Sequence, residues 1–166
     1  MALLVDLAEH FDFNGVQALN IEDETPIDHA IRPELRDNAA LSAVSDADEQ
    51  MLIVIPFMNA VKLHSIVFRG PPGAGPATVK LFKNRLSFDF DDAEREKPSD
   101  VLQVQEAQLG SGSKVALKFV NFQMVTSIAI LIDNNQGGEE QTILSGLTIF
   151  GMPVGGVQNV DGLKKC

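Results

Sequence analysis

The part of this chain that most restricts its fold is residues 51–68, where two apolar stretches follow one another closely. Residues 51–57 are apolar throughout and follow an acidic lead-in. Pro56 and Asn59 interrupt the apolar run before the second stretch, residues 61–68. Short runs rich in Ile and Val, bounded by turn residues, are typical of strands buried on both faces. The two stretches therefore predict a pair of strands in the middle of a β-sandwich.

Other segments with the same character predict the rest of the sheet. They are residues 78–83, 101–105, 114–125, 127–132 and 142–150. Within residues 127–132, the side chains of Ile128, Ile130 and Ile132 share one face, and those of Ala129 and Leu131 share the other. Strand side chains alternate between faces in this way, so this segment predicts a central strand.

Helical signals are short. Residues 5–13 predict one or two helical turns, and the charged residues 89–97 predict a solvated turn of helix before Pro98. Residues 19–47 are polar, which predicts a long loop with a helical turn around residues 34–40. We expect a loop of this length to wrap the domain or to take part in binding. Because no β-α alternation is present, the sequence predicts an all-β fold, an antiparallel β-sandwich of jelly-roll or Greek-key type.

Length and charge limit the classes of function. A chain of 166 residues predicts one domain, and its net charge of −10 repels nucleic-acid phosphates and anionic lipids. No apolar run approaches the roughly 20 residues of a membrane-spanning helix, and residues 1–5 lack the features of a signal peptide. Cys166 is the single cysteine, which favours a reducing compartment. We expect a monomer that binds neither nucleic acid nor membranes.

The residue types needed for catalysis or metal binding are not grouped along the sequence. His10, His29 and His64 each lack a second ligand at a suitable spacing. The acidic residues 89–96 and 46–49 lack the glycine turn of a calcium loop, so we expect solvated faces, with a structural calcium ion as the alternative. Neither a G-x-S-x-G motif nor a phosphate-binding loop occurs. The sequence predicts no enzyme, no metal and no cofactor; a hydrolase using Asp91 and Asp92 is a competing hypothesis.

Several strings resemble a known family. They are DADEQMLIVIPF (46–57), VKLHSIVFRGP (61–71), VKLFKN (79–84), LKFVNFQMVTSIAI (117–130), NQGGEEQT (135–142) and IFGMPV (149–154). In this order they resemble the PITH domain, the proteasome-interacting domain that also occurs at the C-terminus of a thioredoxin-like protein. The resemblance extends over residues 19–165.

The resemblance implies a jelly-roll β-sandwich similar to galactose-binding domains, with a short N-terminal helical turn. It implies a lead-in over residues 1–18, the domain over residues 19–154 and a tail over residues 155–166. It further implies a non-catalytic protein-interaction module of the cytoplasm, and also of the nucleus, whose partner is the proteasome regulatory particle. The Cys-x-x-Cys pair of the family's thioredoxin half has no counterpart, since Cys166 stands alone.

The apolar segments are expected to be core, so a binding surface is expected on the polar or irregular segments. These are residues 21–46, 70–76, 134–140 and the tail from residue 154. The candidate partner-binding residues are Asn135, Glu139, Glu140, Val157, Asp161, Leu163, Lys164 and Lys165. The alternative is a jelly roll that binds a sugar or another small polar ligand through its loops. The absence of Trp and Tyr argues against a sugar site.

Overall fold

The longest element of the structure, a computed structural model that describes residues 3–154, is the 19-residue strand β4 (Met51–Arg69). The prediction of two separate strands here is wrong, because Pro56 and Asn59 do not end the strand. The register against the neighbouring strand shifts between Pro56 and Val61. An irregularity of this kind bends a strand without ending it. The two apolar stretches therefore form one bent strand.

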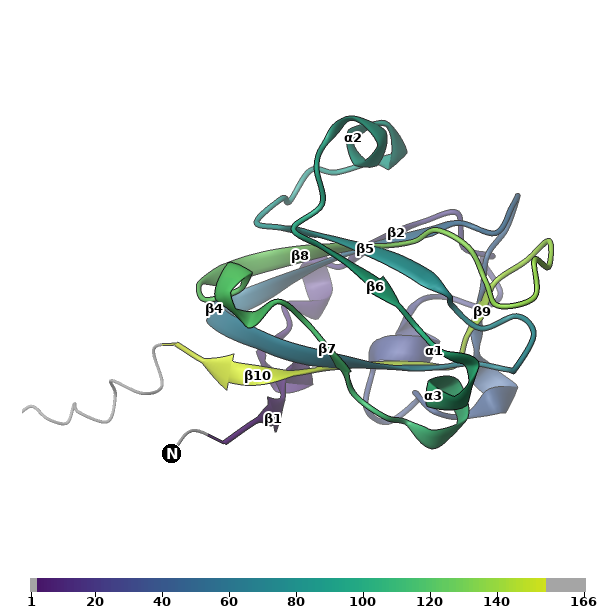
Figure 1. The fold of residues 1–166 in the computed structure, drawn as a ribbon, viewed down its shortest axis with the longest axis horizontal. Coiled ribbons are helices and arrows are strands. Elements are labelled where there is room, and N and C mark those ends of the chain that lie inside the picture. The colour runs from purple at the N-terminus through teal and green to yellow at the C-terminus, as the bar shows by residue number, and fades with distance from the viewer. Residues whose placement is uncertain (1–2, 155–166) are drawn as a thin grey trace, which may run out of the picture.

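The bend allows β4 to belong to two packed layers (Figure 1). The other strands are β1 (Val5–Asp6), β2 (Gln17–Leu19), β3 (Ala43–Val44), β5 (Thr78–Lys83), β6 (Asp100–Gln103), β7 (Val115–Ala116), β8 (Val125–Ile132), β9 (Ile143–Leu144) and β10 (Gly146–Pro153). The first half of β4 pairs with β2 and β8, and the layer continues through β5 to β6. The second half pairs with β10 and β7, and β1 borders β10.

A separate ribbon of β3 and β9 lies at one end of the two layers. All of these strand pairs are antiparallel. The prediction of an all-β, antiparallel β-sandwich is therefore confirmed.

The main hydrophobic core fills the space between the layers, and β8 shows how the sequence builds it. Ile128, Ile130 and Ile132 are buried in this core, whereas Ala129 and Leu131 belong to a second cluster on the outer face of the same layer. The predicted division of this strand into two faces is confirmed. Both faces are apolar because both are covered.

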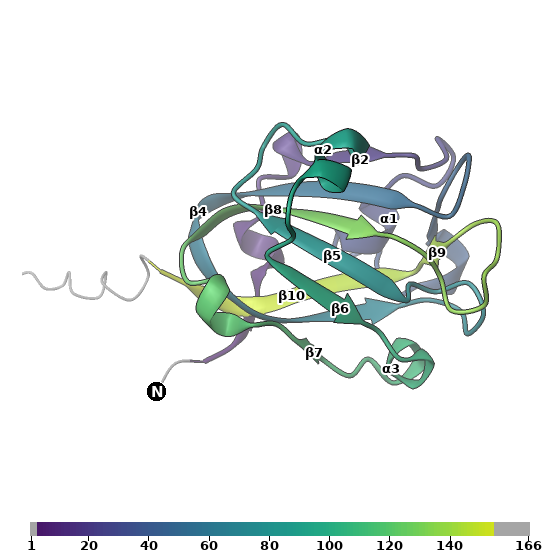
Figure 2. The same ribbon diagram turned by 45° about the horizontal axis from the view of Figure 1, so that its top comes forward.

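The helix α2 (Phe90–Arg95) lies over the outer face of the layer that contains β4, β8 and β5, where it covers the second cluster (Figure 1 and Figure 2). Ala93 packs into this cluster together with Phe82 and Phe88, whose ring centroids lie 4.7 Å apart. The helix therefore closes the outer face of the layer with a small apolar contact.

The acidic residues at the start of α2 stabilise the helix. The Asp89 carboxylate accepts a hydrogen bond from the Asp92 amide, and the Asp92 carboxylate accepts one from the Asp89 amide, both at 3.0 Å. This capping box satisfies amides that an isolated helix end leaves unpaired. The Asp92 amide also lowers the pKa of Asp89 below its ordinary value of 3.8. The predicted helical turn over residues 89–97 is confirmed.

The prediction of one continuous strand over residues 114–125 is wrong. Only β7 is extended there, and the 3-10 turn η4 (Phe119–Asn121) separates it from β8. The Phe122 ring is fully buried, and its carbonyl accepts a hydrogen bond from the Leu63 amide at 3.0 Å. The chain crosses here from one layer to the other, so it cannot remain in a single ladder.

Two further differences follow from long-range contacts. The predicted strand over residues 142–150 is divided into β9 and β10 at Ser145, whose amide donates to the Arg69 carbonyl at 2.8 Å. The helix α3 (Glu106–Ser111), between β6 and β7, was not predicted. It ends at Gly112, whose φ of +72° is the left-handed conformation that glycine adopts without strain.

The remaining short turns lie along the N-terminal third of the chain. They are η1 (Leu7–His10), η2 (Phe13–Gly15), α1 (Asp28–Ile31) and η3 (Ala39–Leu41). The predicted N-terminal helical turn is confirmed. The turn expected around residues 34–40 is present in two parts, since the Arg36 amide donates to the Arg32 carbonyl at 2.8 Å and η3 then follows, while α1 was not predicted. Ala30 and Ile31 are fully buried, so this segment completes the main core. None of the helices in residues 3–154 has the length and apolar content needed to cross a membrane.

We predict that Ile130→Ala lowers the free energy of unfolding by about 2–5 kcal/mol, because it leaves a cavity between the two layers. Val120→Ala, at a side chain that is 81% exposed, should change it by less than about 0.5 kcal/mol. Urea unfolding of both variants measures the difference. Equal midpoints would contradict the placement of Ile130 in the core.

Candidate interaction surface

Two of the segments expected to form a binding surface, residues 70–76 and 134–140, lie side by side at one end of the sandwich. The amide of Gln136 donates to the Gly75 carbonyl at 3.0 Å, and the amide of Gly137 donates to the Gly73 carbonyl at 2.7 Å. A Cβ atom at Gly137 would lie 2.8 Å from that carbonyl oxygen, too close for a side chain. Glycine at this position therefore permits the close pairing of the loops.

Asn135 fixes the shape of the second loop. Its side chain is only 6% exposed, and its Oδ1 accepts a hydrogen bond from the Glu139 amide at 2.7 Å. Its Nδ2 donates to the Glu139 carbonyl at 3.0 Å and to Thr142 Oγ1 at 3.1 Å. Buried polar groups need such partners. The structure thus places the Asn135 side chain inside the loop, where it supports the exposed residues around it.

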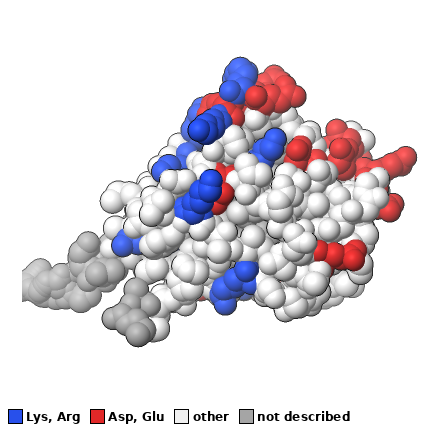
Figure 3. Space-filling model, viewed as in Figure 1, with Lys and Arg blue, Asp and Glu red and all other residues white. Residues whose placement is uncertain are grey.

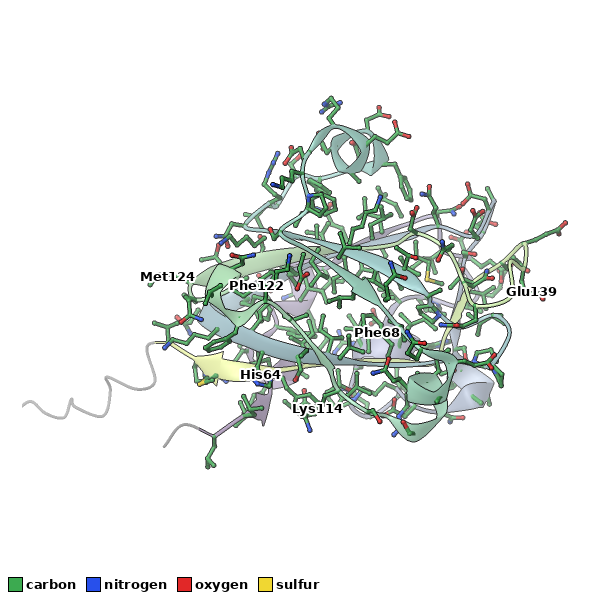
Figure 4. The ribbon with its side chains drawn as sticks, in the orientation of Figure 1. His64, Phe68, Lys114, Phe122, Met124 and Glu139 are labelled. Carbon is green, nitrogen blue, oxygen red and sulfur yellow. The ribbon has the colours of Figure 1, made fainter. Side chains whose placement is uncertain are left out.

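An open cleft of about 710 Å³ lies against these two loops. It is lined by Pro71, Gly73, Ala74, Gly138, Glu139, Glu140, Gln141 and Ile143. Glu139 and Glu140 are both exposed, and Figure 4 shows Glu139 projecting from the end of the molecule. The lining of the cleft therefore combines small residues with two exposed carboxylates.

Gln141 joins this loop to two segments that are distant in sequence. Its Nε2 donates to Glu22 Oε2 at 2.9 Å and to the Ser45 carbonyl at 2.8 Å. Thr142 Oγ1 donates to the Glu49 carbonyl at 2.6 Å. Residues 20–25, 45–50, 70–77 and 133–142 thus form one connected set of loops, which we call the acidic end.

The acidic end concentrates negative charge (Figure 3). Its carboxylates are Glu22, Asp23, Glu24, Asp46, Asp48, Glu49, Asp133, Glu139 and Glu140. Lys80 forms an ion pair with Asp133 at 3.8 Å. Like charges gathered in this way create a negative potential that attracts cationic groups of a partner. The surface suits a basic protein surface better than an acidic one.

Asp48 also has a local structural role. Its Oδ1 accepts hydrogen bonds from Asn20 Nδ2 at 2.8 Å and from the Gln50 amide at 3.0 Å, just before β4 begins. In residues 3–154, no three His, Cys, Asp or Glu side chains are grouped so that they could share a metal ion. His10, His29 and His64 lie on separate elements, η1, α1 and β4.

The candidate residues of the tail lie outside the described residues. They are Val157, Asp161, Leu163, Lys164 and Lys165. The last described residue is Val154, whose amide donates to the Ala60 carbonyl at 3.1 Å. Ala60 lies at the bend of β4, at the end of the sandwich opposite the acidic end. The structure therefore brings Asn135, Glu139 and Glu140 together and places Val154 away from them.

Gln141 and Ile143 line this cleft although neither lies in a segment expected to bind, whereas Pro71 lies within the expected residues 70–76. The contacts of Gln141 span 119 and 96 residues, so no local pattern marks it. The motif NQGGEEQT contains Gln141, and its cluster of turn residues is the one signal that could have directed attention to it.

Solved structures define the class of fold. The family 32 CBM from C. perfringens NanJ in complex with galactose matches with a TM-score of 0.61 at 11% identity, over 89% of this chain and 99% of that chain. The CBM32-1 and CBM32-2 domains from Clostridium perfringens ZmpB in complex with GalNAc match with a TM-score of 0.62 at 12% identity, over 96% and 38% of the two chains. At this identity the likeness shows the fold alone. The protein is a jelly-roll β-sandwich of the galactose-binding-like class.

Sequence comparison then gives the family. The model of the PITH domain matches residues 2–165. Thioredoxin-like protein 1 of Schizosaccharomyces pombe is 37% identical over 145 residues, 84% of this chain and 49% of that protein. PITH domain-containing protein 1 of Homo sapiens is 32% identical over 130 residues, 77% and 61% of the two chains. The chain belongs to the PITH-domain family, and it spans 49% and 61% of the lengths of these two relatives.

We predict that Asn135→Ala lowers the free energy of unfolding by about 1–3 kcal/mol, because it leaves buried groups of the loop without partners. It should also speed hydrogen exchange of the Glu139 amide. Asn14→Ala, at an exposed position, is the control and should change neither. Unaltered exchange at Glu139 in Asn135→Ala would show that the side chain does not hold the loop.

Proposed function

We propose that this chain is a non-catalytic interaction module, working in the cytoplasm and nucleus, that binds the regulatory particle of the proteasome. Its membership of the PITH-domain family supports this proposal most strongly. The chain corresponds to part of relatives such as thioredoxin-like protein 1, so in such a protein the module would connect another domain to the proteasome.

The contact surface we propose is the rim of the acidic end, with Glu139 and Glu140 as its charged residues. Both carboxylates are exposed, and they stand on a loop that the buried Asn135 side chain stiffens. A preorganised loop loses little conformational entropy on binding. Complementary charge at a rim raises the association rate and fixes the orientation of the partners. The tail residues Val157, Asp161, Leu163, Lys164 and Lys165 are proposed as a second, separate contact.

The competing function is binding of a sugar in the same loops, since two of the matched solved structures hold galactose and GalNAc. Sugar sites usually offer an aromatic platform. This chain has no Trp or Tyr, and the residues that line the cleft at the acidic end include no aromatic side chain. We therefore favour a protein partner.

We predict that the tagged chain captures regulatory-particle subunits from cytosolic extract and that E139K/E140K reduces the capture about tenfold, since both contacts become repulsive. The matched control is D91K/E94K, which reverses two exposed charges on α2 and should capture as the original chain does. A chain ending at Val154 tests the tail separately. Quantitative mass spectrometry of the captured subunits is the measurement.

The outcomes separate the parts of the proposal. Loss of capture in E139K/E140K alone supports the acidic end, and loss in the shortened chain alone supports the tail. Absence of regulatory-particle subunits from the capture by the original chain contradicts the proposed function. A rise in melting temperature with galactose or N-acetylgalactosamine would favour the sugar-binding alternative instead.

A further inference from the structure

Large apolar side chains are exposed at the end of the sandwich opposite the acidic end. Met58, Leu86, Val120 and Met124 have 59%, 62%, 81% and 61% of their surface exposed. Single exposed apolar residues are common on protein surfaces. Here four such side chains lie at one end of a chain whose net charge is −10. This grouping indicates a functional surface, because exposed apolar patches mark interaction sites.

Hydrogen bonds hold the loops that carry these side chains next to one another. Asn84 Nδ2 donates to the Met124 carbonyl at 3.3 Å, and the Thr126 amide donates to Asn84 Oδ1 at 2.8 Å. These bonds join the turn after β5 to Met124 and to the start of β8. Val61 pairs with Val125, which brings the bend of β4 beside the same segment. We call the loops 57–60, 84–87 and 119–124 the apolar end.

The strand register places the apolar end far from the acidic end. β4 starts at Met51 opposite Ile132, at the acidic end, and its bend lies beside Val125, at the start of β8. The whole length of β8 therefore separates the two surfaces. Figure 4 shows Met124 and Glu139 at opposite ends of the molecule. A partner bound at one end leaves the other accessible.

The charge around the apolar end is opposite to that of the acidic end. Lys83 and Lys118 are exposed and Lys62 is half-buried, and in the described part of the chain none of the three forms an ion pair with a carboxylate. Asp100, which accepts a hydrogen bond from the Lys118 amide, is buried. Asp12, whose amide bonds to the Pro56 carbonyl, lies beside the bend, and Glu96 forms an ion pair with Arg85 of the loop 84–87. The rim of this surface therefore has an excess of lysine.

We propose that the apolar end binds a segment of a partner protein that presents leucine-type side chains flanked by carboxylates. Met58, Val120 and Met124 supply the apolar contact, and methionine adapts its shape to different partners. Lys62, Lys83 and Lys118 select the flanking acids. An anionic membrane offers similar chemistry, but the net charge of −10 opposes approach to a membrane surface. This surface is distinct from the one proposed for the proteasome.

The test uses fluorescence anisotropy with the full chain and a labelled helical peptide whose leucine stripe is flanked by glutamates. The variant V120D/M124D adds two carboxylates at the apolar end and should bind the peptide at least tenfold more weakly. V101D/Q103D adds two carboxylates at exposed positions on β6 and should bind as the original chain does. A peptide with lysines in place of the glutamates should bind at least tenfold more weakly than the original peptide.

The proposal also requires that raising salt weakens binding, because added ions screen exposed charges. Equal affinity of V120D/M124D and V101D/Q103D would overturn it, as would equal affinity for the two peptides or absence of binding to the glutamate peptide. Sedimentation with phosphatidylserine vesicles that is lost in V120D/M124D would assign the surface to membranes and would also overturn it. These results do not depend on the capture of proteasome subunits.

Discussion

The structure depends on a single strand that is hydrogen-bonded on both sides in both layers. β4 pairs with β2 and β8 before its bend and with β10 and β7 after it. This strand therefore contributes backbone hydrogen bonds and apolar side chains to both layers. The two layers cannot separate without breaking the hydrogen bonds of β4. The main core lies between the layers and includes side chains from both halves of β4. The bend also produces two ends, and the loops at these ends carry the exposed chemistry of the molecule.

Sequence periodicity predicted the parts of the fold that depend on local burial. The faces of β8 follow from its alternating isoleucines, and the bounds of β5 agree with residues 78–83. The bend of β4 was not predictable in the same way. A proline usually ends a strand ladder, but here the strand continues past Pro56 through a register shift. The turn at Phe119 was missed because its apolar residues resemble a strand, and long-range contacts of Phe122 decide its path.

The candidate surface was predictable only in part. Composition singled out residues 21–46, 70–76 and 134–140, and the structure pairs the last two and joins Glu22 and Ser45 of the first to them. Composition could not predict the contacts that join Glu22 and Ser45 to these loops, because Gln141 makes them across 119 and 96 residues of the chain. Asn135 was predicted as a contact residue, and its burial gives it the role of supporting Glu139. Four loops together form the acidic end. Its charge is negative, whereas the excess of lysine makes the charge of the opposite end positive. We propose that a module with two such ends connects one partner with another.

Native-state hydrogen exchange of β4 tests the central claim most directly, because amides that open only with the whole molecule report its global stability. The amides of Ile53 and Ile66 lie in the two halves of β4, one in each layer. If β4 unites the layers, both should exchange with the free energy of global unfolding obtained from urea denaturation. Exchange of Ile66 at a free energy several kcal/mol below that of Ile53, or the reverse, would show that the layers open independently and would contradict the account.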